Sequence, residues 1–141
     1  MNSVILQVAS KYVRWILVIF ALIALYRGHN FPGGGFIGGL LVGLSVVFSS
    51  LANDAQSARN SLIIKSEGYI ALGLLTILIS ILPGVFLKDY FMAGVWTSIH
   101  IPLVGVIKLG TPFLFDIGVF LAVIGVTLMS FFTFSNITKW K

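Results

Sequence analysis

The sequence has no cysteine and very few charged residues. Charged types make up only 9% of its 141 residues, whereas an ordinary soluble domain carries about 25%. A chain with so little charge cannot cover a water-facing surface, which excludes an ordinary soluble domain. The absence of cysteine also excludes disulfides, thiolate zinc sites and cysteine-held iron–sulfur clusters in this chain.

Residues that carry enzyme chemistry are also scarce. The chain has two histidines, His29 and His100, which lie far apart in the sequence, and only four Asp and Glu residues. It shows no nucleophile beside a base, no paired carboxylates, no zinc motif and no phosphate loop. We therefore expect no enzyme activity, no metal and no cofactor. The net charge of +5 does not indicate nucleic acid, because the cations fall mainly at the ends of apolar runs.

Apolar residues are abundant instead. They make up 58% of the chain, and the mean hydropathy is +1.07. One membrane-spanning helix needs roughly 20 residues of this kind. The sequence therefore predicts an all-α integral membrane protein with a single membrane domain over residues 1–141 and about four spans, at 4–26, 32–52, 67–87 and 112–134.

The first span contains two cations, Lys11 and Arg14. The uncharged run behind them, 15–26, would give about 18 Å of helix, which is too short for a hydrocarbon core of about 30 Å. The span is long enough if it begins near Val4 and if both cations snorkel to the headgroups.

The distribution of positive charge predicts an orientation. With four spans, six of the nine Lys and Arg residues fall on the side of the two termini and three on the other side. Because cytoplasmic segments carry an excess of Lys and Arg, both termini are predicted to be cytoplasmic.

Two places make the span boundaries ambiguous. Pro83 is expected to kink or end the third span. Residues 90–107 are uncharged, but they include Trp96, His100 and Pro102. We favour an extended or interfacial loop there, with room for a short interfacial helix. A fifth span is the alternative, and it would move the C-terminus to the other side of the membrane.

A glycine-rich block at 27–40 reads RGHNFPGGGFIGGL. Pro32 suits the first turn of a helix, where its missing N–H is not needed. Small residues recurring every four positions let another helix approach closely, and here they are Gly35, Gly39 and Gly43. One interpretation is a tight turn followed by a packing face. The other adds ion handling, because backbone groups at an irregular helix end can ligate ions; His29 and Asn30 would then line an aqueous vestibule.

The last span contains an acidic residue, Asp116, within the block LGTPFLFDIGVFLAVIG at 109–125. Thr111 and Pro112 predict an N-cap and a first helical position, which places Asp116 just over one turn inside the membrane. Carboxylates inside a bilayer are rare and usually functional. Asp116 is therefore a candidate for binding a proton or cation, or for pairing with a basic residue on a conduction path. The alternative is a carboxylate that is merely stabilised by the helix dipole.

Helical geometry gives the last span two distinct faces. At about 100° per residue, Asp116 and Thr127 share a polar face, whereas Gly118 and Gly125 share an opposite face of small residues. Either face could meet the helix of a partner protein. Thr127 joins Asp116, His29 and Asn30 as a candidate for the ion path.

The two blocks, 27–40 and 109–125, resemble the MnhB (MrpB) family, a small-subunit family of the Mrp-type (Mnh-type) multisubunit cation/proton antiporters of bacteria and archaea. The resemblance extends to size and span number, and thus to essentially the whole chain. Residues 53–108 between the blocks carry nothing diagnostic.

The resemblance implies a small subunit of a hetero-oligomer in the prokaryotic cell membrane. Its large partners would resemble the proton-pumping, antiporter-like subunits of respiratory complex I, and membrane lipids would surround it. The assembled complex would exchange Na+ for H+ at the expense of the proton gradient. Similar subunits occur in the membrane arms of energy-converting hydrogenases. A membrane-arm component of such a redox complex and a purely structural scaffold therefore stay open as alternatives.

Overall fold

The computed structural model describes residues 4–28, 34–53, 55–60, 62–88, 93–101 and 105–137. Within them, four helices are long and apolar enough to cross a membrane. They are α1 (Val4–Gly28), α2 (Gly34–Ala52), α4 (Ser66–Lys88) and α5 (Thr111–Ile137). The predicted fold class, an all-α membrane protein with about four spans, is confirmed.

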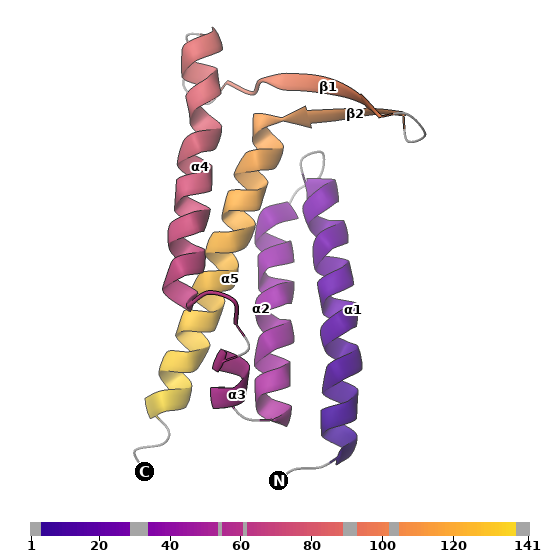
Figure 1. Cartoon of the computed structure of the whole chain (residues 1–141), viewed down its shortest axis with the longest axis vertical. Helices are drawn as coiled ribbons and strands as arrows, with labels where there is room; N and C mark the ends of the chain where they lie inside the picture. Colours follow the sequence, from indigo (N-terminus) through magenta and orange to yellow (C-terminus); the bar gives the residue numbers. More distant parts are fainter. Residues whose placement is uncertain are drawn as a thin grey trace.

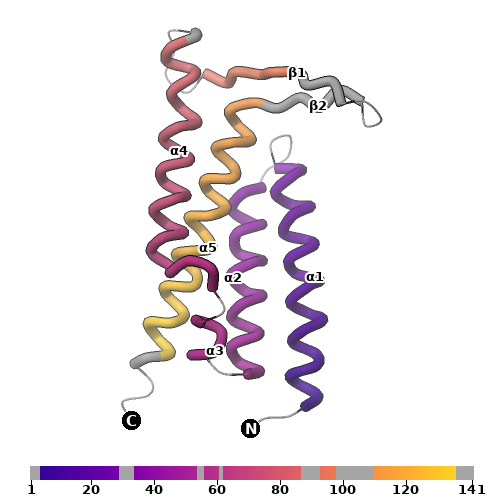
Figure 2. The backbone as a smooth tube through the Cα atoms, in the orientation of Figure 1, coloured from indigo at the N-terminus to yellow at the C-terminus, as the bar shows by residue number. Residues whose placement is uncertain are grey.

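The long helices stand side by side in the order α1, α2, α5, α4 (Figure 1). Contacts are extensive between α1 and α2, between α2 and α5, and between α5 and α4. The start of α1 and the end of α5 lie at the same end of the bundle, as an even number of crossings requires (Figure 1). The continuous backbone trace shows the same row of helices, with α5 between α2 and α4 (Figure 2).

A short helix, α3 (Ala55–Asn60), lies in the polar connection after α2. Ala58 of α3 joins a small core with residues of α2 and α5, and Leu128 of α5 is fully buried in that core. The guanidinium of Arg59 lies 5.9 Å from the ring centre of Phe132, a cation–π distance. These contacts hold the connection against α5.

The helix α4 continues through Pro83 to Lys88. Of the two effects expected of Pro83, a kink or an end of the span, the end does not occur. Proline removes the N–H that would bond to the carbonyl of Ile79, four residues earlier, and its ring crowds that carbonyl. The extensive packing of α4 against α5 stabilises the helix against this cost.

Residues within 90–107 contribute to a β-hairpin. The strand β1 (Trp96–Ile101) pairs antiparallel with β2 (Gly105–Gly110). A short interfacial helix and a fifth helical span are wrong for the described part of this segment. Alternation of β-branched and polar residues favours a strand, and Pro102 comes between the two strands in the sequence.

The base of the hairpin is tied to the start of α5. The N–H of Thr111 donates to the carbonyl of Val95 (3.0 Å), and the N–H of Val95 donates to Oγ1 of Thr111 (3.2 Å). Trp96 lies against its strand partner Gly110, where a methyl group would be only 2.8 Å from the indole ring. The hairpin therefore leaves the bundle in a defined direction, across the end where α1 stops and α2 begins (Figure 1).

Candidate functional site

The glycine-rich block brings the end of α1 against the start of α2. Gly28 and Gly34 face each other so closely that a β-carbon on either would collide with the Cα of the other. Only glycine permits this approach of two backbones. His29, Asn30 and Pro32, which the sequence singled out, come between these glycines and lie outside the described residues.

The next glycine, Gly35, joins this turn to α5. A β-carbon there would collide with the carbonyl oxygen of Asp116. The two sequence blocks are far apart along the chain, and they meet here through direct backbone contact.

The remaining glycines of α2 contact the same face of α5. A methyl group on Gly39 would lie 2.8 Å from the carbonyl oxygen of Phe120, and one on Gly43 would lie 2.6 Å from Cγ2 of Thr127. Real β-carbons essentially never approach so closely. The aliphatic part of Thr127 is therefore packed against α2, about 16 Å along the helix from Asp116.

The opposite face of α5 meets α4. A methyl group on Gly118 would lie 2.8 Å from the carbonyl oxygen of Gly73, and one on Gly125 would lie 2.7 Å from that of Ser66. The small-residue stripes of α2 and α5 are thus used within this chain. Helices of the same chain, rather than those of a partner protein, fill the space beside these residues, which are Gly35, Gly39, Gly43, Gly118 and Gly125.

Asp116 lines a cavity of about 320 Å³ between α4 and the start of α5. Ser80 of α4 is 5% exposed, and its hydroxyl donates to the carbonyl of Ile77 (2.7 Å). The polar lining also includes Thr111. The full lining is Gly28, Ser80, Ile81, Gly94, Thr111, Pro112, Phe115 and Asp116.

Gly28 places the end of α1 at the same cavity as Asp116. This glycine directly precedes His29 in the chain.

The start of α5 also borders this cavity. Pro112, predicted as the first helical residue, is the second residue of α5. Thr111 binds the hairpin backbone in addition to any role as a cap. A carboxylate, two hydroxyls and glycine backbone therefore surround one small space near an end of the bundle.

Ser80 was not among the site residues predicted from the sequence. The sequence shows it as one of few hydroxyls in an apolar span, three residues before Pro83. Its position at the cavity of Asp116 depends on the contact of α4 with α5, which hydropathy does not reveal. Among the described residues, no group of three or more His, Cys, Asp or Glu side chains could hold a metal ion.

The described part of the chain thus has the features of one class of protein. It is a small multi-pass membrane protein whose helices pack closely at glycines, with the acidic residue Asp116 at one of these contacts. The chain belongs to the MnhB family. Residues 5–129 match the family model described as "Domain related to MnhB subunit of Na+/H+ antiporter".

Individual proteins agree with this assignment. The B subunit of the Na(+)/H(+) antiporter of Bacillus subtilis (strain 168) is 34% identical over 127 residues, which cover 90% of this chain and 89% of that protein. The putative antiporter subunit mnhB2 of Staphylococcus haemolyticus (strain JCSC1435) is 34% identical over 125 residues, covering 89% of each.

A solved structure of the Mrp complex from Dietzia sp. DQ12-45-1b contains the same fold. One of its chains matches with a TM-score of 0.71 and 31% identity over 89% of this chain. The match spans only 13% of that longer chain. The present chain therefore corresponds to one small segment of the Dietzia protein, whereas it spans nearly the full length of the two relatives above.

Proposed function

We propose that this chain is a small membrane subunit of a multisubunit antiporter that exchanges Na+ for H+ across the prokaryotic cell membrane. The observation that carries the proposal is the alignment with an antiporter B subunit over 89% of the length of that protein. Because the two proteins align over nearly their whole lengths, this chain can occupy the position of a B subunit in such a complex. The exchange uses the proton gradient, and the chain performs no covalent catalysis.

The geometry favours a subunit over a lone transporter. Secondary transporters usually enclose a midplane site between two repeats, whereas here the described helices form a single row in which Asp116 is the acidic residue that lies against α2 and lines the cavity beside α4. Large apolar side chains such as Ile5, Phe20 and Phe86 are more than half exposed. Lipids and large partner subunits, similar to those of respiratory complex I, would cover them.

Within that complex, Asp116 is proposed to bind the proton or cation in transit. An ionised carboxylate inside a bilayer is costly without a cation or a wet cavity. The cavity of about 320 Å³ beside Asp116 gives room for both an ion and water. His29 and Asn30 complete this proposed ion path at the glycine-rich block. Thr127 remains a candidate, with its aliphatic groups held by Gly43.

The test is Asp116→Asn in the full complex, with Glu67→Gln as the matched control. Glu67 is an exposed carboxylate in the first turn of α4. In everted vesicles, Asp116→Asn should abolish Na+-dependent proton movement, and Glu67→Gln should leave it near the wild-type rate. Both variants should copurify with the partner subunits.

Unchanged transport in Asp116→Asn would favour the scaffold alternative. Packing of Asp116 and Thr127 against α2 is the observation that supports a scaffold. Tagging the chain tests the other alternative: a nickel–iron or iron–sulfur protein among the copurifying partners would assign it to a redox complex.

A further inference from the structure

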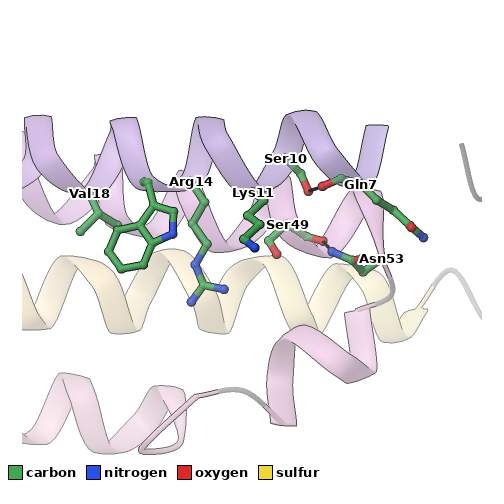
Figure 3. Close-up of a pocket in the computed structure, with 8 residues that line it drawn as sticks. Gln7, Ser10, Lys11, Arg14, Val18, Ser49 and Asn53 are labelled. Carbon is green, nitrogen blue, oxygen red and sulfur yellow. Dashed lines mark hydrogen bonds between the residues drawn. The ribbon is translucent and has the colours of Figure 1, made fainter. Parts of the chain in front are cut away.

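A second, larger cavity lies between α1 and α2, near the end of the bundle where α1 begins. Its volume is about 590 Å³, within the range of small-molecule sites. Figure 3 shows its side chains, which come from the first half of α1 and from the end of α2. The lining residues are Gln7, Ser10, Lys11, Arg14, Trp15, Val18, Ser49 and Asn53.

Two cations of α1 extend into this cavity. Ser10 is 2% exposed and Ala21 is fully buried, which identifies the face of α1 that meets α2. Arg14 lies on that face, one helical turn after Ser10, and Lys11 lies beside it. Figure 3 shows Lys11 and Arg14 extending away from the α1 ribbon, with Lys11 directed toward Ser49.

Both charges lie within α1, a helix long and apolar enough to cross a membrane, where a charge is costly. Arg14 lies about 15 Å along α1 from its first residue, Val4. A membrane-buried cation needs a partner or a wet cavity. Neither Lys11 nor Arg14 forms an ion pair or hydrogen bond with any residue that the structure describes, and the cavity lining contains no carboxylate.

The end of α2 does not supply the missing partner. The carbonyl of Ser49 accepts from the backbone N–H of Asn53 (3.1 Å) and from Nδ2 of the same residue (3.0 Å). The hydroxyl of Ser10 is likewise used, as it donates to the carbonyl of Gln7 (2.9 Å). Within the described part of the chain, the two cations of this cavity therefore have no anion beside them.

We propose that this cavity binds the phosphate of an anionic phospholipid. The guanidinium of Arg14 and the ammonium of Lys11 would donate to the phosphate oxygens, while Val18 and Trp15 would contact the glycerol and the start of the acyl chains. A lipid is favoured because α1 is an outer helix of the row, and its Trp15, Ile16 and Ile19 are more than half exposed beside the cavity. Basic pockets between membrane helices are known to bind such headgroups.

The test compares lipids retained by the full chain, purified with its copurifying subunits from bilayers of equal amounts of phosphatidylglycerol and phosphatidylcholine. Mass spectrometry should show enrichment of phosphatidylglycerol in the wild type. The double variant Lys11→Gln/Arg14→Gln should lose it, because each lost charge-assisted contact weakens binding by about tenfold. The matched control, Lys65→Gln/Lys139→Gln, removes the same charge elsewhere in the sequence and should keep the enrichment.

Several outcomes would overturn the proposal. One is a wild type without enrichment, and another is equal loss in the control, which would indicate general surface charge. If Lys11→Gln/Arg14→Gln instead releases a partner protein while lipid retention is unchanged, the cavity binds a partner's carboxylate. Displacement of phosphatidylglycerol by inorganic phosphate would assign a soluble anion.

A second variant covers failure of the double variant to fold. Ser49→Leu keeps both cations and fills part of the cavity. It should elute from size exclusion as the wild type does, with phosphatidylglycerol enrichment reduced. Wild-type enrichment in Ser49→Leu would contradict the proposed binding position.

Discussion

At the scale of single residues, glycine determines how closely the helices of this protein approach. Membrane helices associate through packing rather than through the hydrophobic effect, because lipid tails are as apolar as leucine. Gly35 shows the consequence, since its missing side chain allows α2 to touch the backbone of Asp116. The same contact positions the carboxylate that we propose for ion transit.

Gly35→Ala is expected to destabilise the protein, because the added methyl group would collide with a backbone carbonyl that cannot move alone. Overpacking of this kind costs about 1–3 kcal/mol. Thermal unfolding of the purified protein in detergent would measure the loss.

Gly68→Ala is the matched control. A β-carbon there would meet the side chain of Ile64, which is 37% exposed and can shift. Alanine also favours a helix more than glycine does. We expect Gly68→Ala to be neutral or slightly stabilising; equal destabilisation by both variants would contradict the role assigned to Gly35.

At the scale of elements, α5 is the helix on which the others assemble. One face meets α2 at Gly39 and Gly43, and the opposite face meets α4 at Gly73. By contrast, α1 contacts chiefly α2. The stability of the bundle should therefore be most sensitive to α5.

Leu128→Ala tests this expectation. Leu128 is fully buried, and truncation of a buried leucine costs about 2–5 kcal/mol. Leu44→Ala on α2 removes the same atoms from a side chain that is 48% exposed, and should cost well under half as much. Urea or thermal unfolding in detergent would compare the two; similar losses would show that α5 is not the centre of the packing.

At the scale of the whole molecule, one end of the bundle holds α3 and the basic cavity, and the other end holds the hairpin and the Asp116 cavity (Figure 1). The excess of Lys and Arg predicts that the first end is cytoplasmic. The proposed ion site would then lie near the external surface, where protons enter.

Cysteine labelling can check this orientation, because the chain has no cysteine of its own. Ser57→Cys would place a thiol on exposed α3, and Thr97→Cys would place one on exposed β1. In intact cells, a membrane-impermeant maleimide should label Thr97→Cys but should label Ser57→Cys only after permeabilisation. The reverse pattern would show that the predicted orientation is inverted.

Much of this architecture could be predicted from local sequence. The four long helices follow from hydropathy, and the two faces of α5 follow from helical periodicity. Which helices these two faces contact could not be predicted in this way. Periodicity left open whether Gly118 and Gly125 meet a partner protein, and the structure shows that they meet α4 of the same chain. A stripe of small residues indicates that a helix approaches, and it does not say which helix.

The two cations of the first span show the same limit. The sequence suggests that Lys11 and Arg14 reach the headgroups, but it does not show that both line a cavity against α2. The hairpin could not be predicted from local sequence either. Its two strands, β1 and β2, lie on either side of Pro102 in the sequence, and each forms only by pairing with the other.

By itself, the sequence determined the membrane location, the number of spans and the presence of one carboxylate inside them, because transfer from water to lipid depends on each residue separately. Only the tertiary structure decided that the glycine-rich block meets Asp116, that Ser80 shares its cavity and that Arg14 faces α2. These are contacts between distant segments, and they depend on shape complementarity between whole helix faces rather than on the affinity of any residue for lipid.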